Sequence, residues 1–208
     1  MTGEVEEGGQ RSAFIHPSSA NGALLEIIEA SQTSNPWPAA GPDWLSPELQ
    51  RTERQPKTRQ LRQVAVLVKD LDQAVDRWGE MFGLKATARF EISFTNLEIA
   101  VMPLAGSDTF IELAQPTSAD VPSARFLEKY GEGIYLIIYQ IDDSLAVDAQ
   151  LKKLGVRYTS SRETENYTNL GFNSIWLHPS AMKGAFTQLS QVLVSDNPWP
   201  PAGDTWHK

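Results

Sequence analysis

The sequence predicts an α+β protein built from two βαβββ modules. One order of patterns occurs twice along the chain: a strand-like segment, a helical segment and then further strand-like segments. Residues 61–68 begin the first set and residues 134–141 begin the second. With 208 residues and 41% hydrophobic content the chain is long enough to bury one good core, so one complete domain is expected.

The first module is predicted to begin at residue 61. Residues 61–68 are rich in valine and alternate in part between apolar and polar, which is typical of a strand. Asp70 then caps a segment whose apolar residues recur at helical spacing until Gly83 ends it. Three more strands are expected at residues 84–90, 97–102 and 109–114.

The second module follows a short helix predicted at residues 123–130. It starts with the strand at 134–141 and continues with a helix that Asp143 begins and Gly155 ends. Its remaining strands are expected at residues 156–160, 173–178 and 184–192.

One stretch occurs twice, at a constant offset of 162 positions. His16-Pro17-Ser18 returns as His178-Pro179-Ser180, and Asn35-Pro36-Trp37-Pro38 returns as Asn197-Pro198-Trp199-Pro200. A repeat at fixed spacing indicates duplicated structure. We therefore predict four segments: a copy of the C-terminal hairpin and its Trp/Pro tail at 1–45, a linker at 46–60, the complete domain at 61–192 and a Trp/Pro-rich tail at 193–208.

Two parts of the repeat allow more than one interpretation. The Trp-Pro segments are interpreted as straps that pack Trp37 and Trp199 on the sheet, rather than as ligands for a proline-binding domain. His16 and His178 share one hairpin position, which favours a role in stabilising the turn over a role in catalysis.

Composition excludes several classes of partner. The net charge of −8 and the lack of any Lys/Arg run argue against nucleic acid and against an anionic membrane surface. No apolar run approaches the ~18 residues of a membrane span, and the acidic N-terminus has no signal-like apolar segment, so a cytoplasmic location is expected. The absence of cysteine excludes thiol nucleophiles and zinc–thiolate sites. A small molecule or another protein is the expected partner.

Residues 61–192 resemble the vicinal-oxygen-chelate superfamily, which includes glyoxalases and bleomycin resistance proteins. Three motifs carry the resemblance: Phe126-Leu127-Glu128-Lys129, Gly131-Glu132-Gly133 and Leu177-His178-Pro179-Ser180. Within the superfamily the sequence is most similar to methylmalonyl-CoA epimerases. The resemblance implies that the two modules form a curved, partly open barrel with a ligand between them, preceded in this chain by an extra β-hairpin.

The resemblance also implies four metal-binding positions on the inner strands. These positions fall on Gln63, Glu112, Leu136 and Gln188, so both histidines of the family are replaced and only Glu112 is a carboxylate. Divalent cations need charged or imidazole donors, so neither a metal nor another cofactor is expected. A divalent metal is expected only if Glu26, which keeps the eighth-strand carboxylate in the N-terminal copy, or a partner chain completes a site.

The catalytic candidates are few. The resemblance places the general base of an epimerase at Phe94, which has no ionisable group. Glu112 is the remaining candidate acid or base, and its alternative interpretation is a buried carboxylate bonded to Gln63 or Gln188. Tyr135 either lines the pocket or is a core residue with its hydroxyl at the surface.

Three hypotheses of function follow. The first is a protein that binds a small organic ligand without metal, in a pocket lined by Gln63, Phe94, Glu112, Tyr135, Leu136 and Gln188. The second is an isomerase, epimerase or lyase acting on an acyl-CoA or related carbonyl compound, through Glu112 or through a site that Glu26 or another chain completes. The third is a structural half of a pseudo-dimer. Since a lone hairpin is marginal in water, the N-terminal hairpin is expected to pair, in a homodimer or pseudo-dimer.

Overall fold

The chain consists of two compact units, an N-terminal unit of residues 1–55 and a larger unit of residues 56–208. The computed structural model describes residues 2–7, 10–29, 40, 58–163 and 170–206. No helix in this part of the chain is long and apolar enough to cross a membrane.

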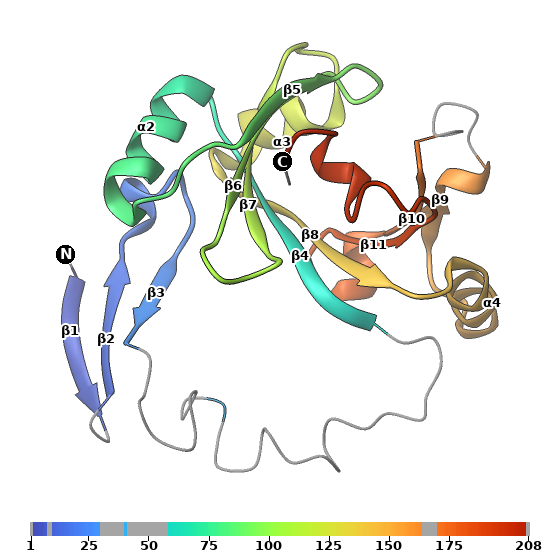
Figure 1. Cartoon of the computed structure of the whole chain (residues 1–208), viewed down its shortest axis with the longest axis horizontal. Helices are drawn as coiled ribbons and strands as arrows, with labels where there is room; N and C mark the ends of the chain where they lie inside the picture. Colours follow the sequence, from blue (N-terminus) through green and yellow to red (C-terminus); the bar gives the residue numbers. More distant parts are fainter. Residues whose placement is uncertain (1, 8–9, 30–39, 41–57, 164–169, 207–208) are drawn as a thin grey trace. The chain divides into compact units, whose positions relative to one another are not determined.

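The larger unit contains the two predicted βαβββ modules (Figure 1). The first comprises β4 (Thr58–Leu67), α2 (Leu71–Phe82), β5 (Ala88–Ile92), β6 (Leu97–Pro103) and β7 (Phe110–Pro116). The second comprises β8 (Gly133–Ile141), α4 (Ser144–Leu154), β9 (Tyr158–Ser160), β10 (Phe172–Leu177) and β11 (Thr187–Val192). The helix α3 (Pro122–Tyr130) joins them, so the predicted fold class is confirmed.

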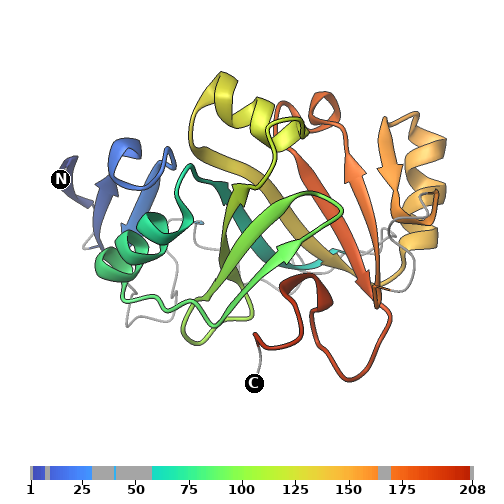
Figure 2. The same cartoon turned by 90° about the horizontal axis from the view of Figure 1, so that it is seen from above.

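The modules share one 8-stranded sheet with the order β5-β6-β7-β4-β8-β11-β10-β9. β4 and β8 are antiparallel neighbours at its centre, and each also pairs in parallel with the last strand of its own module. The second half therefore repeats the first in reverse order. The sheet curves but does not close into a barrel, because β5 and β9 remain its edges (Figure 2).

The long helices end where their local sequence predicts. The Asp70 carboxylate accepts a hydrogen bond from the Gln73 amide at 2.9 Å and begins α2, and Gly83 ends it in the left-handed conformation. Asp143 and Gly155 play the same parts for α4. Each helix contacts the last strands of its own module, α2 on β6 and β7 and α4 on β10 and β11.

Several strand boundaries differ from the predicted ones. β5 begins at Ala88 rather than at residue 84, because sheet pairing starts only where Ala88 lies opposite Val101. β4 begins at Thr58, which corrects the predicted linker of residues 46–60 at its C-terminal end. Thr58 and Gln60 already pair with β8, and Arg59 forms an ion pair with Asp142.

The C-terminal tail folds onto the sheet as a strap, which we define as residues 197–206. Asn197 organises it: its side-chain oxygen accepts the Trp199 amide at 2.9 Å and its side-chain nitrogen donates to the Gly203 carbonyl at 3.0 Å. The short helix η6 (Pro200–Ala202) follows. Trp199 is fully buried, which confirms the strap interpretation for the C-terminal copy. The N-terminal copy with Trp37 lies outside the described residues.

The N-terminal unit has the structure of the last part of the larger unit. β1 (Thr2–Glu7), β2 (Gln10–Ile15) and β3 (Leu25–Ile28) form a 3-stranded sheet in that order. Ser12 pairs with Ile28, and the equivalent residues Ser174 and Ser190 pair in the same register between β10 and β11. The duplicated sequence therefore encodes duplicated structure. The strand β1 was not predicted, because its polar and acidic residues carry no hydrophobic pattern.

The two His-Pro-Ser turns are also alike. In η1 (Pro17–Ser19) the His16 Nδ1 accepts the Ser18 amide at 3.2 Å, and in η5 (Pro179–Met182) the His178 Nδ1 accepts the Ser180 amide at 3.2 Å. In each turn the histidine Nδ1 also lies 2.8 Å from the hydroxyl oxygen of that serine, Ser18 or Ser180. The predicted turn-stabilising role of the two histidines is confirmed.

Gly203 provides a test of the strap. Its φ is +81°, and a Cβ there would lie 2.6 Å from Cε1 of Phe90. We expect Gly203→Ala to lower the free energy of unfolding by about 1–3 kcal/mol, measured by urea denaturation. Gly106→Ala is the control, since Gly106 has a φ of +72° but nothing within 4 Å of an added Cβ. Equal losses in the two variants would show that the strap does not pack on Phe90.

Candidate functional site

A line of hydrogen bonds crosses the inner face of the first module. The Trp199 indole N–H donates to Gln63 Oε1 at 2.5 Å, and Gln63 Nε2 donates to Glu112 Oε2 at 2.5 Å. All three side chains are buried. The bond between Gln63 and Glu112 is the contact that the alternative interpretation of Glu112 predicted.

Glu112 is a carboxyl group in an apolar surrounding. Burial raises its pKa to about 7, and the hydrogen bond from Gln63 opposes the rise. In the sheet Glu112 lies opposite Ala65 of β4 and Val101 of β6, both of which are buried. The group therefore changes its charge near neutral pH.

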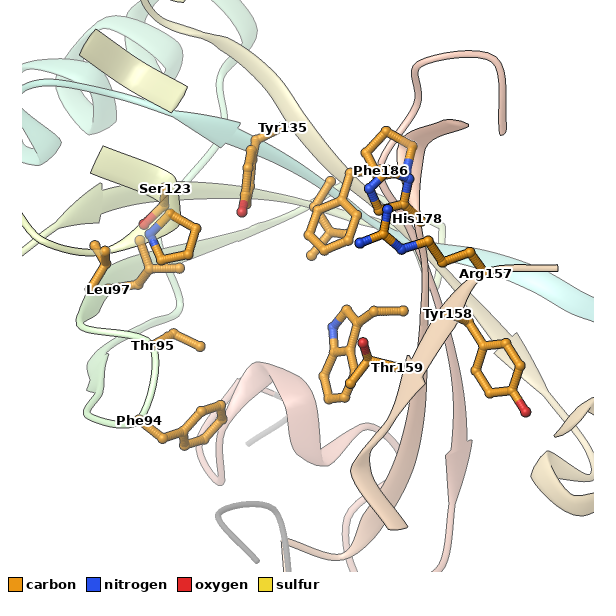
Figure 3. Close-up of a pocket in the computed structure, with 15 residues that line it drawn as sticks. Phe94, Thr95, Leu97, Ser123, Tyr135, Arg157, Tyr158, Thr159, His178 and Phe186 are labelled. Carbon is orange, nitrogen blue, oxygen red and sulfur yellow. The ribbon is translucent and has the colours of Figure 1, made fainter. Parts of the chain in front are cut away.

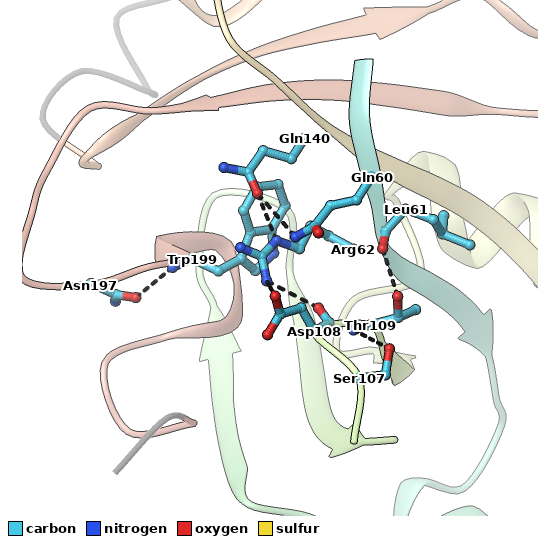
Figure 4. Close-up of polar contacts among 9 residues, drawn as sticks. All are labelled: Gln60, Leu61, Arg62, Ser107, Asp108, Thr109, Gln140, Asn197 and Trp199. Atoms are coloured by element: carbon cyan, nitrogen blue, oxygen red, sulfur yellow. Dashed lines mark hydrogen bonds and ion pairs between the residues drawn. The ribbon is translucent and has the colours of Figure 1, made fainter. Parts of the chain in front are cut away.

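Arg62 places its guanidinium over the Trp199 ring (Figure 4). Its guanidinium lies 5.3 Å from the ring centroid and donates to Gln140 Oε1 at 2.8 Å and to the Asp108 carbonyl at 3.1 Å. A register shift in β4 between Leu61 and Gln63 brings the consecutive residues Arg62 and Gln63 onto the same indole. Burial lowers the pKa of Arg62, and Asp108 partly offsets this.

Gln188 belongs to a separate network in the second module. Its Oε1 accepts the Trp176 indole N–H at 2.8 Å, and its Nε2 donates to the hydroxyls of Ser174 and Ser190, each at 2.9 Å. The two hydroxyls lie 2.6 Å apart. Both the oxygen and the nitrogen of the Gln188 amide are thus engaged inside the module.

A pocket of about 520 Å³ lies between the two modules (Figure 3). Its wall is mainly apolar and aromatic and includes Leu97, Leu136, Trp176 and Phe186. Arg157 and His178 add polar groups from the second module, and no carboxylate in the described part of the chain pairs with the exposed Arg157.

Tyr135 forms one side of this pocket. Its ring packs edge-on against two phenylalanine rings. The distance between ring centroids is 5.5 Å to Phe186 and 5.2 Å to Phe126. Figure 3 shows its hydroxyl directed toward the pocket. Burial raises the pKa of Tyr135, so its hydroxyl remains a neutral donor and acceptor at neutral pH.

The structure divides the six predicted ligand-binding residues into two groups. Phe94, Tyr135 and Leu136 line the pocket. Gln63, Glu112 and Gln188 are not among its lining residues, because Trp199 and Trp176 hold the two glutamine amides and Gln63 in turn holds Glu112. Among the described residues, no three His, Asp or Glu side chains gather around one point.

Sequence reasoning missed several pocket residues. Trp176, Phe186 and Arg157 line the same pocket as the predicted Leu136 but lie far from it in sequence. The pairing of β8 with β11 brings Phe186 beside Ile137, where its carbonyl accepts the Ile137 amide at 3.1 Å. The signal that was available is Phe186, an aromatic residue near the start of the strand predicted at 184–192.

Comparisons with known proteins agree with one another. Residues 62–172 match the family profile described as the Glyoxalase/Bleomycin resistance protein/Dioxygenase superfamily. The chain is 32% identical over 133 residues to the ethylmalonyl-CoA/methylmalonyl-CoA epimerase of Cereibacter sphaeroides, covering 64% of this chain and 97% of that protein. It is 26% identical over 169 residues to the mitochondrial methylmalonyl-CoA epimerase of Bos taurus, covering 81% of this chain and 87% of that protein.

Solved structures show the same fold. The methylmalonyl-CoA epimerase of Mycobacterium tuberculosis superposes with a TM-score of 0.59 at 24% identity, over 68% of this chain and 93% of that one. A methylmalonyl-CoA epimerase in complex with methylmalonyl-CoA and NH4+ superposes with a TM-score of 0.58 at 20% identity, over 68% of this chain and 100% of that one.

The raised pKa of Glu112 predicts a pH-dependent stability. The folded state binds a proton that the unfolded carboxyl, with an ordinary pKa of 4.5, releases between pH 4.5 and about 7. The contribution of Glu112 to the free energy of unfolding is therefore fully present below pH 4.5. It is lost as the pH rises through 7, which lowers the free energy of unfolding by about 3 kcal/mol in total. We expect Glu112→Gln, compared with the wild type by urea denaturation from pH 5 to pH 8, to be relatively more stable at the upper end. Parallel curves for the two proteins would show that Glu112 does not titrate in this range.

Proposed function

The chain belongs to the Glyoxalase/Bleomycin resistance protein/Dioxygenase superfamily, and we propose that it binds a small organic ligand between its two modules without a divalent metal. The observation that carries the proposal is the position of Trp199. Its indole occupies the inner face of the first module and bonds to Gln63, while a pocket of about 520 Å³, which Trp199 does not line, stays open between the modules. This volume is typical of small-molecule sites.

The residues at the family's four metal-binding positions do not fit a divalent cation. Leu136 has no donor atom, and the amide oxygens of Gln63 and Gln188 already accept indole N–H groups. Glu112 alone offers a carboxylate, and its pKa of about 7 leaves it partly protonated at neutral pH. Mn, Co, Ni and Zn ions require several charged or imidazole donors at once.

The pocket favours a ligand with an apolar body and one negative group. Leu97, Trp176 and Phe186 supply apolar and aromatic surface, and the Arg157 guanidinium supplies positive charge at its border. The open pocket also argues against the third hypothesis, a purely structural half, for which a filled cavity is expected.

Two observations favour catalysis as a second candidate function. The relative from Cereibacter sphaeroides is named an epimerase, and Glu112 has a pKa near the pH at which a general acid or base works best. An isomerase, epimerase or lyase acting on an acyl-CoA or related carbonyl compound would use Glu112 or a site completed by Glu26 or another chain. Against it, Phe94 stands where the base is expected, and Glu112 is covered together with Trp199.

We also propose that the N-terminal sheet pairs with a further module, in a homodimer or pseudo-dimer. It has three strands, and small isolated sheets are marginal in water. The proposal is independent of the pocket.

Ligand binding is tested with an aromatic anion. We expect anilinonaphthalene sulfonate to bind the full chain with a rise in fluorescence and Arg157→Gln to weaken binding about fivefold, as for the loss of one exposed charge. Lys153→Gln is the matched control, since Lys153 is exposed on α4 and does not line the pocket. Thr159→Trp narrows the pocket from the edge strand β9 and should abolish binding. A folded Thr159→Trp variant that binds like the wild type would exclude this pocket as the site.

Metal content separates the two candidate functions. After incubation with Mn, Co, Ni or Zn salts and desalting, we expect plasma mass spectrometry to find far less than one ion per chain. The same samples, mixed with methylmalonyl-CoA in deuterium oxide, should show no deuterium incorporation by NMR. Nearly one ion per chain, lost in Glu112→Gln or Glu26→Gln, together with deuterium incorporation, would establish the isomerase instead.

A further inference from the structure

The larger unit shows what normally covers the duplicated hairpin. Along one edge, β11 pairs in parallel with β8, with Thr187 opposite Ile137 and Ser190 opposite Gln140. On one face, Val147 and its neighbour Leu151 of α4 pack in a cluster with β10 and β11. A strand and the amphipathic helix that follows it thus complete this structure.

The N-terminal unit has the same hairpin without that cover in the described part of the chain. β3, the equivalent of β11, is the last strand of its sheet. Ile27, the equivalent of Leu189, is 46% exposed, and Leu24, which directly precedes the strand, is 64% exposed. An edge strand with free backbone groups and apolar side chains is a ready site for pairing with another strand.

The polar side of the duplicated hairpin differs at one charge. Glu26 occupies the position of Gln188, whose amide is bonded by Trp176, Ser174 and Ser190. The N-terminal equivalents of these three residues are Phe14, Ser12 and Ile28, so the indole donor and one hydroxyl are absent around Glu26. A partner that covers this side has to bring a positively charged or hydrogen-bonding group for the carboxylate.

We infer that the N-terminal sheet is a docking surface for a strand and helix of another module of the same superfamily, one that lacks its own last two strands. The docked strand runs parallel to β3, its helix covers Ile27, and it supplies a donor to Glu26. A second copy of this chain fits less well, because its β8 is already paired on both edges, with β4 and with β11. This inference names the partner in the proposed pairing of the N-terminal sheet and rests on that proposal.

The probe is the Cereibacter sphaeroides relative, shortened by the segment that corresponds to β10 and β11. This relative aligns over 97% of its length, so the cut can be placed from the alignment. When the shortened relative is mixed with the full chain, we expect analytical ultracentrifugation to show a complex with one copy of each protein. Ile27→Lys should lower the affinity of this complex at least tenfold, and Glu26→Gln should lower it about fivefold. Leu193→Lys, a change at an exposed apolar residue of the larger unit, should have no effect.

The experiment remains decisive if the shortened relative is unfolded by itself. Its far-ultraviolet circular dichroism should then gain helical signal when the full chain is added, but not with Ile27→Lys. No complex and no gain of structure, with the full chain monomeric, would overturn this inference and the pairing proposal together. A full chain of twice the monomer mass that Ile27→Lys dissociates would overturn this inference in favour of a homodimer. Neither outcome concerns the ligand pocket.

Discussion

The inner face of the first module depends on the burial of one indole ring. Trp199 lies against the guanidinium of Arg62 and donates its N–H to Gln63, whose amide in turn donates to Glu112. A buried amide and a buried carboxyl are costly to leave without partners, and this relay satisfies them in sequence. Removing a tryptophan from such a position typically costs about 3–5 kcal/mol, so the strap is part of the core rather than an appendage.

This packing also decides where chemistry can take place. A carboxyl group with a pKa of about 7 is suited to proton transfer, but a general acid or base must reach its substrate within hydrogen-bond distance. Gln63 occupies that distance on one side of Glu112, and the Trp199 indole in turn bonds to Gln63. The open volume lies instead between the two modules, beside Leu136 and Trp176. Neither Glu112 nor Trp199 therefore lines the pocket that is able to accept a ligand.

The parts of the structure that follow from neighbouring residues were predictable. Asp70 and Gly83 delimit α2 because capping is a local interaction, and the His-Pro-Ser turns follow from contacts over two residues. The bond between Trp199 and Gln63 joins residues 136 positions apart, and no local pattern indicates it. The same holds for the pocket: Leu136 was placed by the family resemblance, whereas Arg157 reaches the pocket only through the pairing of β9 with β10.

In the duplicated hairpin, local interactions determine the backbone structure and distant interactions determine the side chains on its two faces. The turn and the strand register depend on the hairpin's own backbone and on one histidine, and both copies keep them. The two faces of the hairpin depend on other elements, and there the copies differ: Glu26 replaces Gln188 and Phe14 replaces Trp176. A hairpin that kept its backbone structure while changing the side chains that meet its surroundings is adapted to different surroundings. The charge at Glu26 and the exposed Ile27 describe what those surroundings must supply, namely a donor on one face and an apolar helix on the other.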